Sequence, residues 1–91
     1  MAITVLIPQP LRALTGNQSK VTAAGASLAD CIAQLDASYP GMRDRLMDES
    51  GQIRRFVNIY VNGEDVRFSD GLGTGLKDGD EVSIVPAVAG G

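Results

Sequence analysis

The sequence predicts an α+β domain in which one main helix covers a mixed sheet of about five strands. Several segments have the alternation or the β-branched composition of strands, whereas one segment carries a long apolar stripe at helical spacing. The predicted order is strand, strand, helix, strand, strand, strand. A length of 91 residues, with 44% hydrophobic and 21% charged residues, fits one globular domain.

The first hairpin is predicted at the start of the chain. Apolar side chains alternate along Ala2 to Ile7, which favours a strand. Pro8 and Pro10 then end the pairing, because proline has no amide to donate. Thr15-Gly16-Asn17 has turn chemistry, and Lys20 to Ala23 is expected to return beside the first strand.

The main helix is expected to begin at Ser27, whose hydroxyl can cap the amide of Asp30. The apolar stripe at i, i+3, i+4 and i+7 consists of Leu28, Cys31, Ile32 and Leu35. Tyr39-Pro40-Gly41 is predicted to stop the helix. Cys31 is therefore interpreted as a core residue and not as a sulfur-bearing group, since free cysteine is commonly buried.

The middle of the chain predicts a second hairpin. Met42 to Met47 favours a short helical turn, and Asp48 to Arg54 an exposed polar loop. Aromatic and β-branched residues indicate a strand over Phe56 to Val61. Asn62-Gly63 favours a tight turn, and Glu64 to Phe68 is the predicted partner strand.

The closing part predicts a glycine-rich loop and a last strand. Ser69 to Lys77 is expected to be a loop or one 3₁₀ turn, Asp78-Gly79-Asp80 a turn, and Glu81 to Val85 a strand. The whole order fits the β-grasp (ubiquitin-like) layout, in which the first and last strands lie parallel at the centre. A ferredoxin-like arrangement is disfavoured because only one long helix is predicted.

Composition excludes several functions. A net charge of −3 and a pI near 4.6 argue against nucleic-acid or anionic-membrane partners, and the pair Arg54-Arg55 is interpreted as a solvated loop feature. The absence of histidine removes the commonest general base and metal ligand, so we predict a protein that is not an enzyme and binds no metal or cofactor itself. One cysteine and no signal-like start favour a reducing cytoplasm.

The last residues are expected to carry the chemistry. Residues 1–86 are predicted to form the domain, and 87–91 a flexible tail that ends in Gly90 and Gly91. A tail without side chains can thread a narrow channel and present its carboxylate to another protein's machinery. A carboxylate is a poor electrophile until it is activated, for example as an anhydride with AMP. Because Gly71 to Gly75 fits no phosphate-binding fingerprint, the ATP site is expected on a partner.

Three segments resemble the MoaD/ThiS family of sulfur carriers: Phe56–Gly63, Asp78–Val82 and Val85–Gly91. The resemblance covers nearly the whole chain and is strongest to the branch that serves cysteine biosynthesis. It implies a β-grasp fold and a thiocarboxylate on Gly91. The implied partners are an E1-like adenylating enzyme, then a sulfur-accepting enzyme: a pyridoxal-phosphate cysteine synthase, with a metalloprotease releasing the product, or the large molybdopterin synthase subunit.

A docking face is predicted from strand alternation. The residues expected to face outward near the tail are Leu6, Phe56, Asn58, Tyr60 and Val85, and Val88 and Ala89 of the tail are expected to contact the partner as well. Three other functions stay open: the small subunit of molybdopterin synthase, a protein modifier joined to lysines through Gly91, and a plain interaction module. The sequence does not choose the acceptor pathway.

Overall fold

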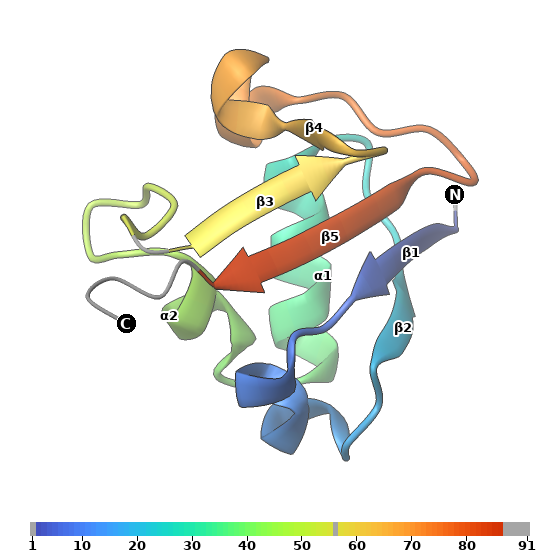
Figure 1. The fold of residues 1–91 in the computed structure, drawn as a ribbon, viewed down its shortest axis with the longest axis vertical. Helices are drawn as coiled ribbons and strands as arrows, with labels where there is room; N and C mark the ends of the chain where they lie inside the picture. Colours follow the sequence, from blue (N-terminus) through green and yellow to red (C-terminus); the bar gives the residue numbers. More distant parts are fainter. Residues whose placement is uncertain (1, 56, 87–91) are drawn as a thin grey trace.

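The computed structural model describes residues 2–55 and 57–86. Five strands, two α-helices and three 3₁₀ helices make up this part of the chain (Figure 1). In chain order they are β1 (Ile3–Leu6), η1 (Gln9–Thr15), β2 (Lys20–Ala23), α1 (Leu28–Ser38), α2 (Met42–Leu46), β3 (Val57–Val61), β4 (Glu64–Asp65), η2 (Val66–Phe68), η3 (Gly71–Gly73) and β5 (Glu81–Pro86).

The strands form one mixed sheet in the order β2-β1-β5-β3-β4. β1 and β5 pair in parallel at the centre, with Val5 opposite Val82, and every other pairing is antiparallel. α1 lies against one face of this sheet (Figure 1). The predicted β-grasp layout is confirmed, including the central parallel pair.

The core lies between the sheet and α1, because each contributes one apolar face. All four residues of the predicted helical stripe are buried, and the Ser27 hydroxyl accepts the predicted hydrogen bond from the Asp30 amide at 3.2 Å. The buried sheet residues include Val5, Ile59 and Val82. Since these side chains alternate along their strands with side chains that are not buried, the other face of the sheet is left open.

One predicted feature of the local structure was wrong, and one element was not predicted. The strand expected over Glu64 to Phe68 ends after Asp65, because the Asp65 carboxylate accepts the Arg67 amide (2.9 Å) and starts a 3₁₀ turn. That turn brings Val66 into the core, where it is 1% exposed. The sequence also gave no indication of η1, in which the prolines occupy the start of a 3₁₀ helix instead of only ending a strand.

A side-chain network joins the turns at the end of the sheet farthest from Pro86. Asn62 and Gly63 take positive φ values of 52° and 86°, as the predicted tight turn requires. The Asn62 amide donates to Asp80 Oδ1 (3.0 Å) and accepts from the Glu81 amide (3.0 Å). The Lys77 amide donates to Asp80 Oδ2 (2.8 Å). Asp80 therefore links the β3–β4 turn to the turn before β5.

We expect the free energy of unfolding of the Asp80→Asn variant to depend less on pH, in the acid range, than that of the wild type. The hydrogen bonds from the Asn62 side chain and the Lys77 amide lower the pKa of Asp80 below the ordinary value of an aspartate. A carboxylate with a lowered folded pKa adds stability that is present above the unfolded pKa and is lost as pH falls through the folded pKa. Urea unfolding at several pH values should therefore show a stability loss in the variant near neutral pH that shrinks in acid.

Asp70→Asn is the matched control, because within the described residues the Asp70 carboxylate accepts no hydrogen bond. Its unfolding profile should follow that of the wild type. Parallel profiles for Asp80→Asn and the wild type across the acid range would contradict the role given to Asp80.

Candidate functional site

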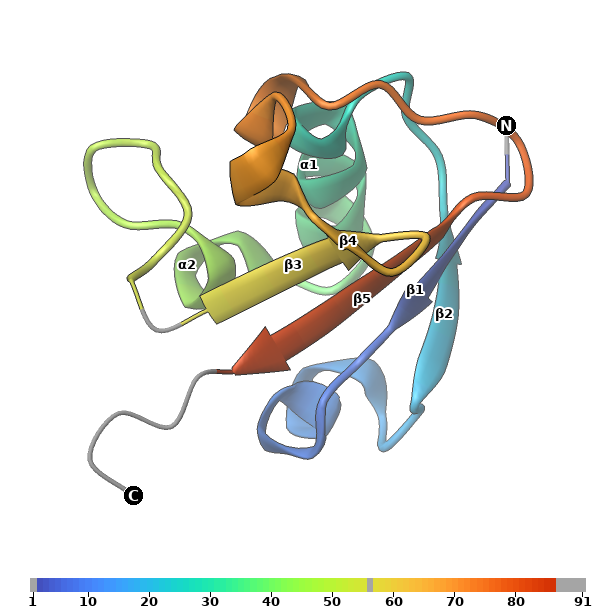
Figure 2. The same ribbon diagram turned by 45° about the horizontal axis from the view of Figure 1, so that its top comes forward.

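The central strand β5 ends beside the first residue of β3. Val57 pairs with Pro86, so the strand stays in the sheet up to its last residue. Figure 2 shows the β5 arrow pointing away from the β3–β4 turn, toward the side of α2 and η1. We call this side the exit end. The predicted site residues of the tail, Val88, Ala89, Gly90 and Gly91, lie outside the described residues, so their roles stay predictions.

The structure brings the predicted docking residues of the described chain together on the open face of the sheet. Register places Leu6, Ser83 and Tyr60 in one row, and Val85 beside Asn58 in the next row toward the exit end. Val85 is 41% exposed, and the other predicted residues are partly buried. The face therefore presents an apolar centre with polar groups, close to Pro86. Its docking role stays a prediction, and Phe56 lies outside the described residues.

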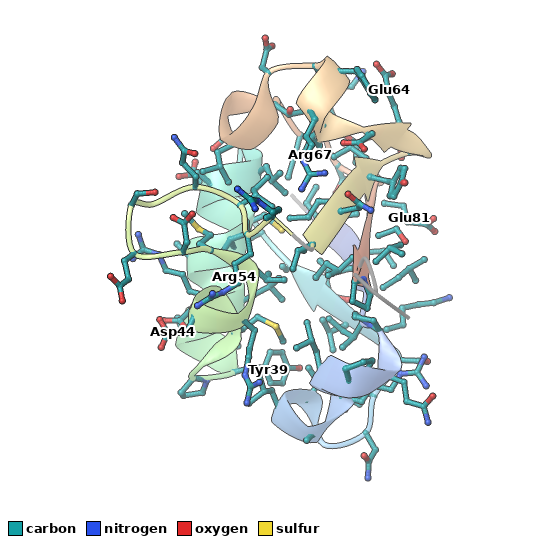
Figure 3. All side chains as sticks on the ribbon, turned by 60° about the vertical axis from the view of Figure 1, so that its left-hand side comes forward. Tyr39, Asp44, Arg54, Glu64, Arg67 and Glu81 are labelled. Atoms are coloured by element: carbon teal, nitrogen blue, oxygen red, sulfur yellow. The ribbon has the colours of Figure 1, made fainter. Side chains whose placement is uncertain are left out.

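Arg67 was not predicted from the sequence, yet it fixes the segment that enters β3. Its Nη1 donates to Asn58 Oδ1 (2.7 Å), and its Nη2 donates to the carbonyls of Val57 (2.8 Å), Arg55 (3.2 Å) and Arg54 (3.3 Å). Figure 3 shows Arg67 directed from η2 toward β3. One guanidinium thus orients the Asn58 side chain and holds the loop before β3. No local pattern indicates this, because the contacts span about ten residues of chain.

A groove of about 530 Å³ opens at the exit end. Four segments line it, and their residues are Pro8, Pro10, Leu11, Asp44, Arg45, Arg54, Val57, Ile84 and Pro86. The walls are mainly apolar, and the charged groups come from α2 and the loop before β3. The groove was not predicted, because its lining comes from four separate segments of the sequence.

In the part of the chain that the structure describes, we find no metal-binding cluster and no reactive thiol. No group of three His, Cys, Asp or Glu residues lies close enough to hold a metal ion there. Burial raises the pKa of the Cys31 thiol to about 11, so the thiolate is scarce at neutral pH and the predicted core role holds. Between residues 2 and 86, Phe56 aside, no helix has the length and apolar character needed to cross a bilayer.

The fold and its exit end define a small ubiquitin-like protein whose central strand leads directly into the terminal segment. The ThiS family profile matches residues 5–91. The chain belongs to the ThiS family, as the resemblance in its sequence indicated.

Individual relatives are also similar over the whole chain. The sulfur carrier protein CysO of Mycobacterium tuberculosis is 57% identical over 93 aligned positions, which cover 100% of both chains. The crystal structure of the Amycolatopsis orientalis BexX/CysO complex contains a chain with a TM-score of 0.93 and 48% identity, covering 99% of this chain and 100% of that one. The small archaeal modifier protein 3 of Haloferax volcanii is 44% identical over 72% of this chain and 71% of its own length.

Proposed function

We propose that this chain is a sulfur-carrier protein of cysteine biosynthesis that works through the carboxylate of Gly91. The observation that supports this most strongly is 57% identity to a sulfur carrier protein, over the full length of both chains. The topology agrees with it, since the central strand β5 ends at Pro86, directly before residues 87–91. A body of this kind can be held by a partner while the terminus reaches a reaction centre.

The proposed chemistry takes place in two steps at the terminal carbonyl. The Gly91 carboxylate attacks the α-phosphate of ATP on an E1-like enzyme, pyrophosphate leaves, and an acyl adenylate forms. A sulfide donor then attacks the acyl carbon and AMP leaves, so that a thiocarboxylate replaces the carboxylate. Five residues beyond Pro86 span at most about 17 Å, which suits delivery into a partner's active site.

The thiocarboxylate sulfur would then pass to an acceptor enzyme. For the cysteine branch this is a pyridoxal-phosphate enzyme, and a metalloprotease would release the cysteine formed at the end of the carrier. The Amycolatopsis chain was crystallised with a protein partner, BexX, which supports a carrier that works by docking. This chain's part is to bind, to present Gly91 and to leave.

Intact-protein mass spectrometry tests the proposal. The chain is incubated with an E1-like enzyme of the same organism, ATP and sulfide, and its mass is compared with that of the untreated chain. We expect a gain equal to the exchange of one oxygen for sulfur, located at Gly91 by fragmentation. An unchanged mass with every E1-like enzyme of the organism would overturn the proposal.

A protein modifier is the second candidate, and the Haloferax modifier protein is the observation that favours it. Both functions need the same activated terminus, so activation does not separate them. Shifted species that carry the chain on a denaturing gel, with Gly91 joined to lysine in peptide fragments, would support conjugation. A single thiocarboxylate species would support the carrier.

We expect Val85→Asp on the open face to weaken binding to the E1-like enzyme by about tenfold or more without unfolding the domain. Val85 is exposed and lies one residue before the end of β5, so the added charge meets a partner rather than the core. Calorimetric titration measures the affinity. Thr22→Asp on β2 is the control, because Thr22 is exposed far from Pro86, and equal affinities for the two variants would contradict the predicted docking face.

A further inference from the structure

The groove at the exit end must lie against any protein that takes the tail. Pro86 is part of its lining, and five residues extend at most about 17 Å from there. An active site that encloses Gly91 uses most of that length, so the partner's surface has to approach the exit end closely. The groove is therefore part of the contact area under the proposed function.

The charged side chains that line the groove are two arginines, Arg45 and Arg54, and one acid, Asp44. Arg54 is fixed there by a hydrogen bond from its Nε to the Asp44 carbonyl (2.8 Å), and Figure 3 shows the two side chains next to each other. Arg45 lines the same groove, and Arg55 lines an adjoining hollow with Arg54 and one acid, Asp48. Among the described residues, the side chains of Arg45 and Arg55 and the Nη atoms of Arg54 donate no hydrogen bond. These guanidinium groups are available to carboxylates of another protein.

Charge is distributed unevenly along the molecule, although the chain as a whole is acidic. The basic residues of the exit end are Arg12, Lys20, Arg43, Arg45, Arg54 and Arg55, and the acidic ones there are Asp36, Asp44, Asp48 and Glu49. The acidic residues of the opposite end are Asp30, Glu64, Asp65, Asp70, Asp78, Asp80 and Glu81, and the basic ones there are Arg67 and Lys77. Basic residues therefore outnumber acidic ones at the exit end, whereas acidic residues outnumber basic ones at the opposite end. In Figure 3, Arg54 and Asp44 lie far from Glu64 and Glu81.

We propose that the exit groove receives an apolar side chain of the enzyme that activates the tail, and that Arg45, Arg54 and Arg55 pair with carboxylates that flank that side chain. This inference rests on the proposed function and adds the chemistry of the partner: an acidic rim around the mouth of its channel. An acidic rim attracts the exit end and repels the opposite end, so the carrier approaches with its tail forward. The Arg54-Arg55 pair thus acts in partner contact instead of being only solvated.

Charge reversal tests the proposal in the activation assay with the E1-like enzyme. We expect Arg45→Glu/Arg55→Glu to lower kcat/KM for adenylate formation at low salt by about tenfold or more, through KM, because contacts away from the reacting carbonyl act on binding. The wild-type kcat/KM should fall as salt rises, and the variant should be nearly insensitive to salt. Lys77→Glu reverses a single charge at the opposite end and should leave kcat/KM within about twofold of wild type.

Each outcome decides one question. If the wild-type chain gives no adenylate or thiocarboxylate, the proposed function fails. If it reacts, and the double variant equals it in kcat/KM and in salt dependence, the basic docking proposal alone is overturned. Thermal unfolding checks both variants, and if the double variant is unfolded, the single change Arg55→Glu in the exposed loop gives the decision. Tight binding of a DNA oligonucleotide that competes with the enzyme would also overturn it.

Discussion

A chain shortened to end at Ala89 is expected to lose adenylation by the E1-like enzyme, with kcat/KM at least about a hundredfold below that of the full chain. Its new terminal carboxylate falls roughly 7 Å short of the position that Gly91 reaches. The fold should be unaffected, because the pairing of β5 ends at Pro86. Pyrophosphate release measures the adenylation rate, and circular dichroism checks the fold.

A control of the same length distinguishes the effect of tail length from the effect of having glycine at the last two positions. Gly90→Ala/Gly91→Ala restores the length but adds two methyl groups, so it should be activated less well than the full chain and better than the shortened one. A shortened chain with the wild-type rate would contradict the role of Gly91. So would full activity of a chain that carries an extra, untrimmed residue after Gly91.

Gly25→Ala is expected to destabilise the fold by about 3 kcal/mol, a large part of the total for a domain of this size. A Cβ atom at Gly25 would lie 2.6 Å from the amide nitrogen of Cys31 and 3.0 Å from the carbonyl carbon of Asp30. Both are backbone atoms in the first turns of α1, so they cannot move aside without shifting the helix and its buried stripe. Urea unfolding measures the change in free energy.

Gly75→Ala is the matched control. A Cβ atom there meets nothing within 4 Å, so the change should stay within about 0.5 kcal/mol of wild type. If Gly25→Ala unfolds at the same urea concentration as this control, the close approach of the chain to α1 does not limit stability.

The helix and the sheet could be predicted because their signals are local. Ser27 caps the amide of Asp30, and the stripe from Leu28 to Leu35 follows helical spacing, so α1 begins and ends as expected. Asn62-Gly63 specifies its turn through backbone preferences alone. The order of such elements leaves few topologies, and the central parallel pair follows from it.

What the sequence did not predict depends on contacts between distant segments. Gly25 looks like any loop glycine until α1 is packed against it. Arg67 looks like a strand residue until η2 turns it toward the carbonyls before β3. The exit groove exists only once the residues around Pro8, Asp44 and Pro86 meet. The role of Gly91 was predicted from its chemistry and from the family resemblance, and it stays a prediction for experiment.

The parallel pairing of β1 with β5 also determines how the body bears mechanical load. The chain enters the sheet at Ile3 and leaves it at Pro86, from opposite ends of two adjacent strands. Tension between these points pulls β1 and β5 past each other, so the ladder bonds between them share the force instead of opening one by one. In single-molecule stretching, the domain should resist more force from these points than from a pair that opens the β3–β4 hairpin. A pull between the start of β1 and the end of β5 therefore loads the central pair of strands in shear.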